Sequence, residues 1–120
     1  MKSIKIGNET HVLKFTSKAI MNLSAKGINL GTLGEGLQKQ DLSEFYQAFY
    51  EGLKPLNPNI TFDRSLELLD IYFEDENNEM EGLILLVMEE FATAMGLGKA
   101  FKKEMQAERE KLEKEAKKKA

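Results

Sequence analysis

The stretch LSEFYQAFYEGL, residues 42–53, has the strongest helical pattern in the chain. Its apolar residues recur three and four positions apart, at Leu42, Phe45, Tyr46, Phe49, Tyr50 and Leu53. Residues at this spacing share one face of a helix. Asp41 with Glu44 can cap its start, and Pro55 stops it, because the residue before a proline disfavours helical backbone. We predict a helix over 42–53 whose aromatic face packs in the core; a ligand groove along that face is the alternative.

The segments before this helix predict a β-hairpin. Short runs with apolar residues at 3–6 and 11–15 flank the turn-forming residues 7–10. Two strands alone are only marginally stable in water, so the hairpin must pack against helices.

Helical spacing and capping residues predict the other helices, at 17–26, 32–39 and 62–73, and a last core helix that Gly96 and Gly98 end. The predicted caps are Thr16 or Ser17, Thr32 with Glu35, Thr61, and Asn78 with Glu81. The fold class is therefore mainly α (α+β): an N-terminal β-hairpin packed on a bundle of about five helices, with a charged C-terminal helical tail. The predicted core consists of Phe15, Ile20, Leu23, Phe45, Phe49, Leu53, Leu66, Leu69, Leu83, Val87 and Phe91.

The 120 residues suit a single domain. Residues 1–98, the body, contain 8 Lys/Arg and 15 Asp/Glu, a net charge of −7, whereas the tail at 99–120 contains 9 and 5, a net charge of +4. An acidic body repels phosphate backbones, so nucleic acid is not an expected partner. The sequence has no secretory signal and no apolar run near the roughly 20 residues that cross a bilayer, so we expect an intracellular protein away from membranes.

The composition excludes most catalytic chemistry. There is no cysteine, and His11 is the only histidine, so thiolate nucleophiles and multi-histidine metal centres are excluded. The acidic segment 75–81 resembles a calcium loop only at its start, because Met80 stands where glycine is required and Leu86 where a bidentate carboxylate is required. The glycines at 31–36 match no phosphate-binding motif. We therefore expect no enzyme activity, no metal and no cofactor.

Binding to another protein is the remaining role. Leu97, Phe101 and Met105 lie four residues apart and prolong an apolar stripe into the tail, with Lys102 and Lys103 beside them. We predict these five as the partner-binding residues. The same apolar residues would support homo-oligomers.

The order of elements resembles the tail assembly chaperones of long-tailed phages, or prophages, of Gram-positive bacteria. The segments IKIGNE (4–9) and VLKFTSKAI (12–20) look like the opening hairpin and first helix of that family. The segments FYQAFYEGL (45–53) and ITFD (60–63) are similar to its central helices. The resemblance covers about residues 1–95.

This resemblance implies a small non-enzymatic protein that binds the tape measure protein and assists recruitment of tail tube subunits. It also implies a place in the host cell cytoplasm rather than in the mature virion. A small helical adaptor or regulatory protein that acts by protein–protein binding is the alternative.

Two interpretations of the tail at 99–120 stay open. One is a solvated Lys/Glu helix stabilised by pairs such as Glu110 with Lys114. The other is a tether to a second module in a longer product of ribosomal frameshifting, which the resemblance implies for many members. Lys117-Lys118-Lys119 suits the second, because lysine codons can form a slippery adenine-rich run.

Overall fold

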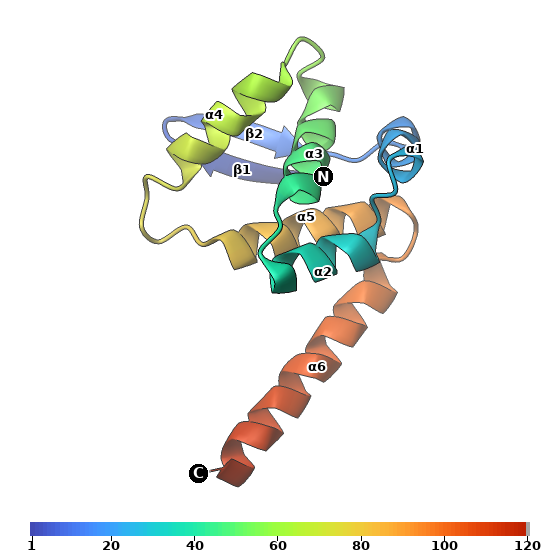
Figure 1. The fold of residues 1–120 in the computed structure, drawn as a ribbon, viewed down its shortest axis with the longest axis vertical. Coiled ribbons are helices and arrows are strands. Elements are labelled where there is room, and N and C mark those ends of the chain that lie inside the picture. Colours follow the sequence, from blue (N-terminus) through green and yellow to red (C-terminus); the bar gives the residue numbers. More distant parts are fainter. Residues whose placement is uncertain (120) are drawn as a thin grey trace.

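The computed structural model describes the backbone of residues 1–119 and the side chains of residues 1–116. Its elements are β1 (Lys2–Ile6), β2 (Glu9–Leu13), α1 (Ser17–Ala25), α2 (Leu30–Lys39), α3 (Ser43–Leu53), the short 3-10 helix η1 (Lys54–Leu56), α4 (Phe62–Tyr72), α5 (Met80–Ala94) and α6 (Gly98–Lys119). The predicted fold class is confirmed: an N-terminal hairpin packs on helices, and α6 forms the C-terminal helical tail (Figure 1).

The hairpin turns more tightly than its sequence predicts. β1 and β2 are antiparallel, and Ile6 pairs with Glu9 directly across Gly7, which has φ of +60°. Glycine adopts this left-handed conformation without strain, so a two-residue turn suffices. The second strand therefore starts at Glu9 and ends at Leu13, two residues earlier than predicted at each end.

The apolar side of the hairpin is buried against α3 and α4. Ile4, Ile6 and Leu13 have exposed fractions of 5% or less, and the amide of Lys14 donates to the carbonyl of Gly52 at 2.9 Å. On the other side of this core, Phe15 contacts Phe91 of α5 edge-on, with ring centroids 5.4 Å apart. One core therefore joins the hairpin, α3 and α5.

All of the predicted core residues except Ile20 and Leu66 are buried. Ile20 is half-buried and packs against the core, whereas Leu66 is half-buried outside it. On α4, the buried residues are Ser65, Leu68 and Leu69. The prediction that Leu66 belongs to the core is therefore wrong, because α4 turns Leu68 rather than Leu66 toward the core. The buried hydroxyl of Ser65 donates to the carbonyl of Phe62 at 2.6 Å.

Three of the predicted caps are wrong. α2 starts earlier, because the Asn29 side chain accepts from the amide of Thr32 and the Thr32 hydroxyl accepts from the amide of Asn29. α3 and α5 begin after Leu42 and Glu79, neither of which forms a side-chain cap. The predicted cap of α4 is confirmed, since the Thr61 hydroxyl accepts from the amide of Arg64 at 3.1 Å.

The polar residues of these failed caps stabilise the preceding loops instead. The carboxylate of Asp41 accepts from the hydroxyl of Ser43 at 2.7 Å and from its amide at 3.2 Å. These hydrogen bonds hold the pKa of Asp41 below its usual value. The side-chain amide of Asn78 donates to the carbonyl of Tyr72 at 2.9 Å, which closes the loop between α4 and α5.

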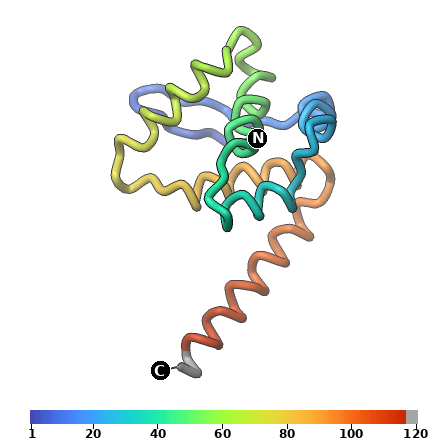
Figure 2. The backbone as a smooth tube through the Cα atoms, in the orientation of Figure 1, coloured from blue at the N-terminus to red at the C-terminus, as the bar shows by residue number. Residues whose placement is uncertain are grey.

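Helix α6 runs away from the body (Figures 1 and 2). A short turn separates it from α5: Gly96 has φ of +77°, and the amide of Leu97 donates back to the carbonyl of Ala92 at 2.8 Å. The next residue, Gly98, leaves no room for a side chain, because a Cβ there would lie 2.8 Å from the hydroxyl of Thr93. The two glycines thus set the direction in which α6 leaves.

Candidate protein-binding site

Helix α5 is apolar on more than one face. Residues 83–88 are six consecutive apolar residues, which cover almost two helical turns. The core buries Leu83, Ile84 and Val87, and Met88 lies toward Gly34 of α2. Leu85 stays half-buried and outside this core. A helix with so wide an apolar surface normally has all of that surface covered. The half-buried side of α5 at Leu85 is therefore a candidate binding surface.

Leu85 forms part of one wall of a groove between α5 and α6. The two helices meet at the Gly96 turn and diverge from there, and a hollow of about 480 Å³ lies between them. Its lining residues are Leu85 and Glu89 from α5, with Phe101, Lys102, Met105, Gln106, Arg109, Glu110 and Glu113 from α6. The apolar residues Leu85, Phe101 and Met105 lie among polar and charged side chains, as in many protein–protein contacts.

An ion pair crosses the narrow end of the groove. The ammonium of Lys102 lies 3.3 Å from the carboxylate of Glu89, and both side chains are partly exposed. Such surface pairs stabilise by about 0–1 kcal/mol, so this contact orients the start of α6 without fixing it strongly. Glu90, the next residue along α5, is buried.

The structure brings three of the five predicted partner-binding residues together in this groove. Phe101 and Met105 are half-buried and Lys102 is exposed. Leu97 and Lys103 are also exposed, but neither lines the groove: Leu97 lies in the turn before α6, and Lys103 is on another side of the helix.

The sequence did not predict the α5 residues Leu85 and Glu89, nor four polar lining residues of α6: Gln106, Arg109, Glu110 and Glu113. Leu85 and Glu89 belong to no separate motif, and only Leu85 had a signal, namely an apolar run too wide for one buried face.

One apolar side chain of α6 lies beyond the contact with α5. Leu112 is 65% exposed, and helical periodicity places it on the same face as Phe101 and Met105. We call these three residues the α6 ridge. The ridge is half-buried where α6 leaves the body and exposed two turns later.

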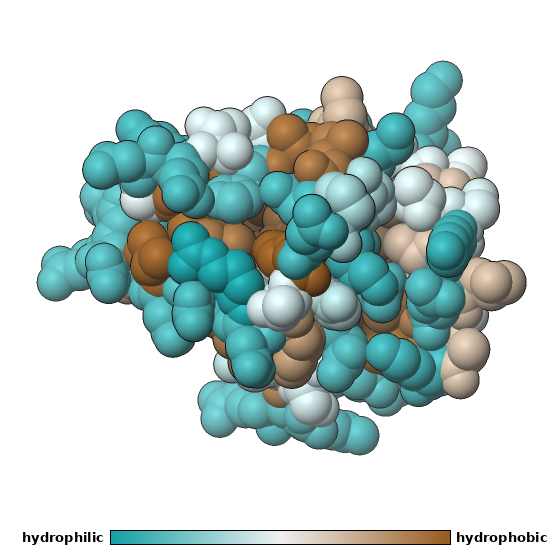
Figure 3. Space-filling model, turned by 90° about the horizontal axis from the view of Figure 1, so that it is seen from above, coloured by the Kyte–Doolittle hydropathy of each residue, from teal (hydrophilic) through white to brown (hydrophobic). Residues whose placement is uncertain are grey.

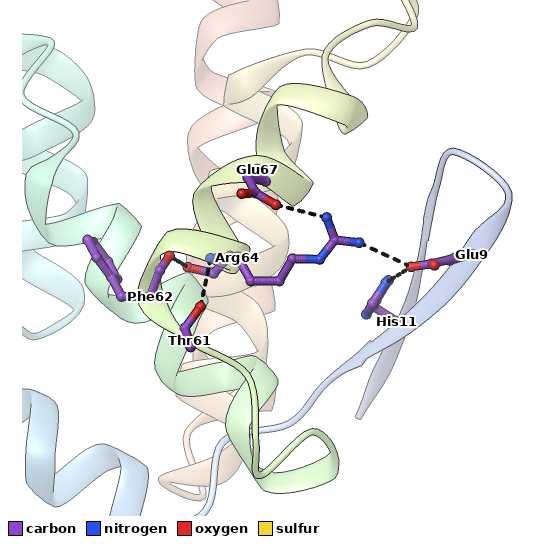
Figure 4. A network of polar contacts seen from close by, with 7 residues as sticks. Glu9, His11, Thr61, Phe62, Arg64 and Glu67 are labelled. Carbon is purple, nitrogen blue, oxygen red and sulfur yellow. Dashed lines mark hydrogen bonds and ion pairs between the residues drawn. The ribbon is translucent and has the colours of Figure 1, made fainter.

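A second polar cluster lies at the hairpin and serves to connect elements (Figure 4). His11 of β2 is within 2.9 Å of the carboxylate of Glu9, and the guanidinium of Arg64 lies 3.9 Å from that carboxylate. The same guanidinium pairs with Glu67 at 3.0 Å. The cluster ties β2 to α4 across the edge of the sheet.

Two carboxylates are buried among the side chains that the structure describes, and each has a cationic neighbour. The amino group of Met1 lies 2.5 Å from the carboxylate of Glu90, and the ammonium of Lys54 lies 3.7 Å from that of Glu51. Pairing of this kind offsets the cost of removing a charge from water. Nothing in the local sequence distinguishes these two glutamates from the exposed ones.

Among the described residues, no three His, Cys, Asp or Glu side chains are grouped so as to hold a metal ion. The carboxylate of Asp75, in the segment that resembled a calcium loop, accepts from the amide of Asn77 at 2.9 Å. No helix in the described part of the chain is long and apolar enough to cross a bilayer.

The end of the molecule opposite α6 shows small hydrophobic patches separated by polar side chains (Figure 3). Exposed Leu56 lies beside a hollow that Pro58 and Arg64 also line. Comparison with protein-family models, with curated proteins and with solved structures found no match to this chain.

Proposed function

We propose that this protein is a tail assembly chaperone of a long-tailed phage or prophage, which binds a helical segment of the tape measure protein and assists recruitment of tail tube subunits. The groove between α5 and α6 is the binding surface in this proposal. The proposal rests on the resemblance of residues 1–95 to that family and on one structural observation. An open groove, with apolar residues on both of its helical walls, lies where α6 leaves the body.

A groove between two diverging helices suits an amphipathic helix as its ligand. The apolar face of such a helix would contact Leu85 on one side and Met105 on the other, while its polar face stays in water. The charges of the walls are mixed, with Glu89 and Arg109 both present. The groove therefore suits a ligand helix that has both acidic and basic residues beside its apolar stripe.

Co-expression with the tape measure protein tests this proposal. We expect the wild-type chain to keep the tape measure protein in the soluble fraction, and the variant Met105→Glu to lose at least most of this effect, because a carboxylate would enter the apolar part of the groove. The fraction of soluble tape measure protein, measured by gel densitometry, is the readout.

Met21→Glu is the matched control. Met21 lies on α1, away from the groove, and is 64% exposed, so this variant changes the same residue type without touching the site. Circular dichroism would verify that both variants are folded. If the tape measure protein stays insoluble with the wild-type chain, the chaperone role is rejected, and a helical adaptor with another partner becomes the better interpretation. Equal solubility with both variants would reject the groove as the surface.

A further inference from the structure

The α6 ridge is longer than the surface that covers it. Phe101, Met105 and Leu112 lie within an arc of about 40° around the helix, at 3.6 residues per turn. Only the first two reach the α5 wall, whereas Leu112 is 65% exposed. Because the apolar ridge extends beyond the body, a partner that covers it must lie along α6.

The spacing of the ridge is self-complementary. If a second copy of α6 lies antiparallel to the first, with the two-fold axis beside Gln106 and Ala107, Phe101 of each copy faces Leu112 of the other. Met105 of each copy then lies near the centre of the contact. Contacts of this kind, in which the same patch serves on both chains, are the usual form of homodimer interfaces.

The charges beside the ridge fit the same arrangement. Glu104 and Lys111 are both exposed, lie on the same flank of the ridge, and are two turns apart. The antiparallel arrangement places Glu104 of each copy opposite Lys111 of the other, which gives two attractive pairs. On the groove flank, Lys102 and Arg109 of the two copies approach each other, and Glu89, which already pairs with Lys102 at 3.3 Å, offsets their like charge.

The overall charge distribution points to the same occupant. The body has a net charge of −7 and the tail a net charge of +4, and an antiparallel pair directs the basic end of each tail toward the acidic body of the other copy. In this arrangement the α6 helix of the second copy lies beside α5 of the first copy. It therefore covers the open side of the groove.

We propose that two copies of this chain associate through antiparallel α6 helices, each covering the α6 ridge of the other at the mouth of the groove. This inference is independent of the proposed role in tail assembly. The two are linked in one respect: Phe101 and Met105 are covered in the dimer, so a second copy and a helical ligand compete for the groove. The dimer is then the form that protects the ridge when no ligand is bound.

Charge exchange tests the arrangement with the full chain. In sedimentation equilibrium from about 10 µM to about 1 mM, we expect the wild-type mass to rise from 13.6 kDa toward twice that value. Glu104→Lys alone brings two lysines together in each homodimer pair, and Lys111→Glu alone brings two glutamates together. Each variant is expected to dimerise at least about ten-fold more weakly than the wild type.

An equimolar mixture of the two variants is the decisive sample. In a mixed dimer every Glu104 again faces Lys111, and every lysine at position 104 faces a glutamate at position 111, so dimerisation should return to at least the wild-type level. A folding defect in either variant could not produce this recovery. A mixture that stays monomeric while both variants retain helical circular dichroism would overturn the proposal, as would a wild-type chain that is monomeric at about 1 mM.

Leu112→Glu and Met21→Glu provide an independent check on the ridge. The two side chains are almost equally exposed, at 65% and 64%, so neither substitution disturbs the core. We expect Leu112→Glu to abolish dimerisation and Met21→Glu to leave it unchanged. Equal dimerisation by both variants would place the contact elsewhere and overturn the proposal.

Discussion

Gly52 of α3 lies directly against Leu13 of β2, with no room between them for a Cβ atom. A Cβ built on Gly52 would overlap the Leu13 side chain and lie 3.0 Å from the ring of Phe15. Leu13 is completely buried, so it has no free space into which to move. A glycine in the last turn of α3 therefore allows the hairpin to approach the helix closely enough for the amide of Lys14 to donate to the carbonyl of Gly52.

We expect Gly52→Ala to lower the free energy of unfolding. Alanine favours the helix by about 1 kcal/mol over glycine, but overpacking in a closed core typically costs about 1–3 kcal/mol. The net effect should be a loss, measured as a lower midpoint in urea. Gly82→Ala is the control, because Gly82 of α5 is exposed and has no atom within 4 Å of the added Cβ. The free energy of unfolding of Gly82→Ala should rise by up to about 1 kcal/mol. A Gly52→Ala variant that is more stable than the wild type would contradict the close approach of Gly52 and Leu13.

Leu68→Ala and Leu66→Ala separate the observed orientation of α4 from the predicted one. Leu68 has an exposed fraction of 1% and belongs to the core, whereas Leu66 is half-buried outside it. Removing a buried leucine side chain costs about 2–5 kcal/mol, so Leu68→Ala should lower the free energy of unfolding by that amount. Leu66→Ala should cost less than half as much. Chemical denaturation of both variants measures the difference, and the reverse order would restore the predicted face.

Deletion of residues 106–120 should leave the body folded. The contact of α6 with α5 is made by its first two turns, and every described residue from Gln106 to Ala116 is exposed. Surface changes away from the core are usually within about 0.5 kcal/mol, so the melting temperature should hardly change while the helical signal decreases in proportion to the residues removed. An unfolded truncated chain would show that the tail stabilises the body.

Tyr72 should make the stability sensitive to alkaline pH. Burial, with a smaller contribution from the carboxylate of Asp75, raises the pKa of Tyr72 above its ordinary value of 10.0. The phenol therefore ionises in the unfolded chain before it ionises in the folded one. Its contribution to stability is complete below about pH 10 and is lost as the pH rises through the higher pKa of the folded state.

The variant Tyr72→Phe isolates this contribution. Between about pH 9 and pH 11, it should lose less free energy of unfolding than the wild type, because the other ionising groups are common to both chains. Urea denaturation at the two pH values measures both losses. Equal losses would mean that the Tyr72 phenol ionises alike in the folded and unfolded chains.

The helical segments were predictable because each depends on residues close together in sequence. The aromatic spacing in 42–53 and the Thr61 cap are local signals, and both appear in the structure as predicted. The start of α2 was not predictable in the same way, because Asn29 and Thr32 are both capping residues that lie three positions apart, and Asn29 competes with Thr32 for the cap. The pairing of Glu90 with Met1 spans 89 positions, and no local pattern contains it.

The candidate site was predictable on one side only. The α6 residues Phe101 and Met105 stand out because apolar residues are rare in a charged tail. The α5 wall does not stand out, since Leu85 is hidden in a run of apolar residues most of which are core. Which member of such a run stays outside the core depends on how α2 and α3 cover the helix, and that is a property of the tertiary structure.

A small rotation at the turn formed by Gly96 and Gly98 produces a large displacement at the far end of α6. Helix α6 has 22 residues and is about 33 Å long, so a rotation of about 10° at its base moves its far end by roughly 6 Å. Substitutions in the turn can therefore shift Leu112 relative to the body without altering any residue of the ridge. The reach of the tail is set by the three residues from Gly96 to Gly98.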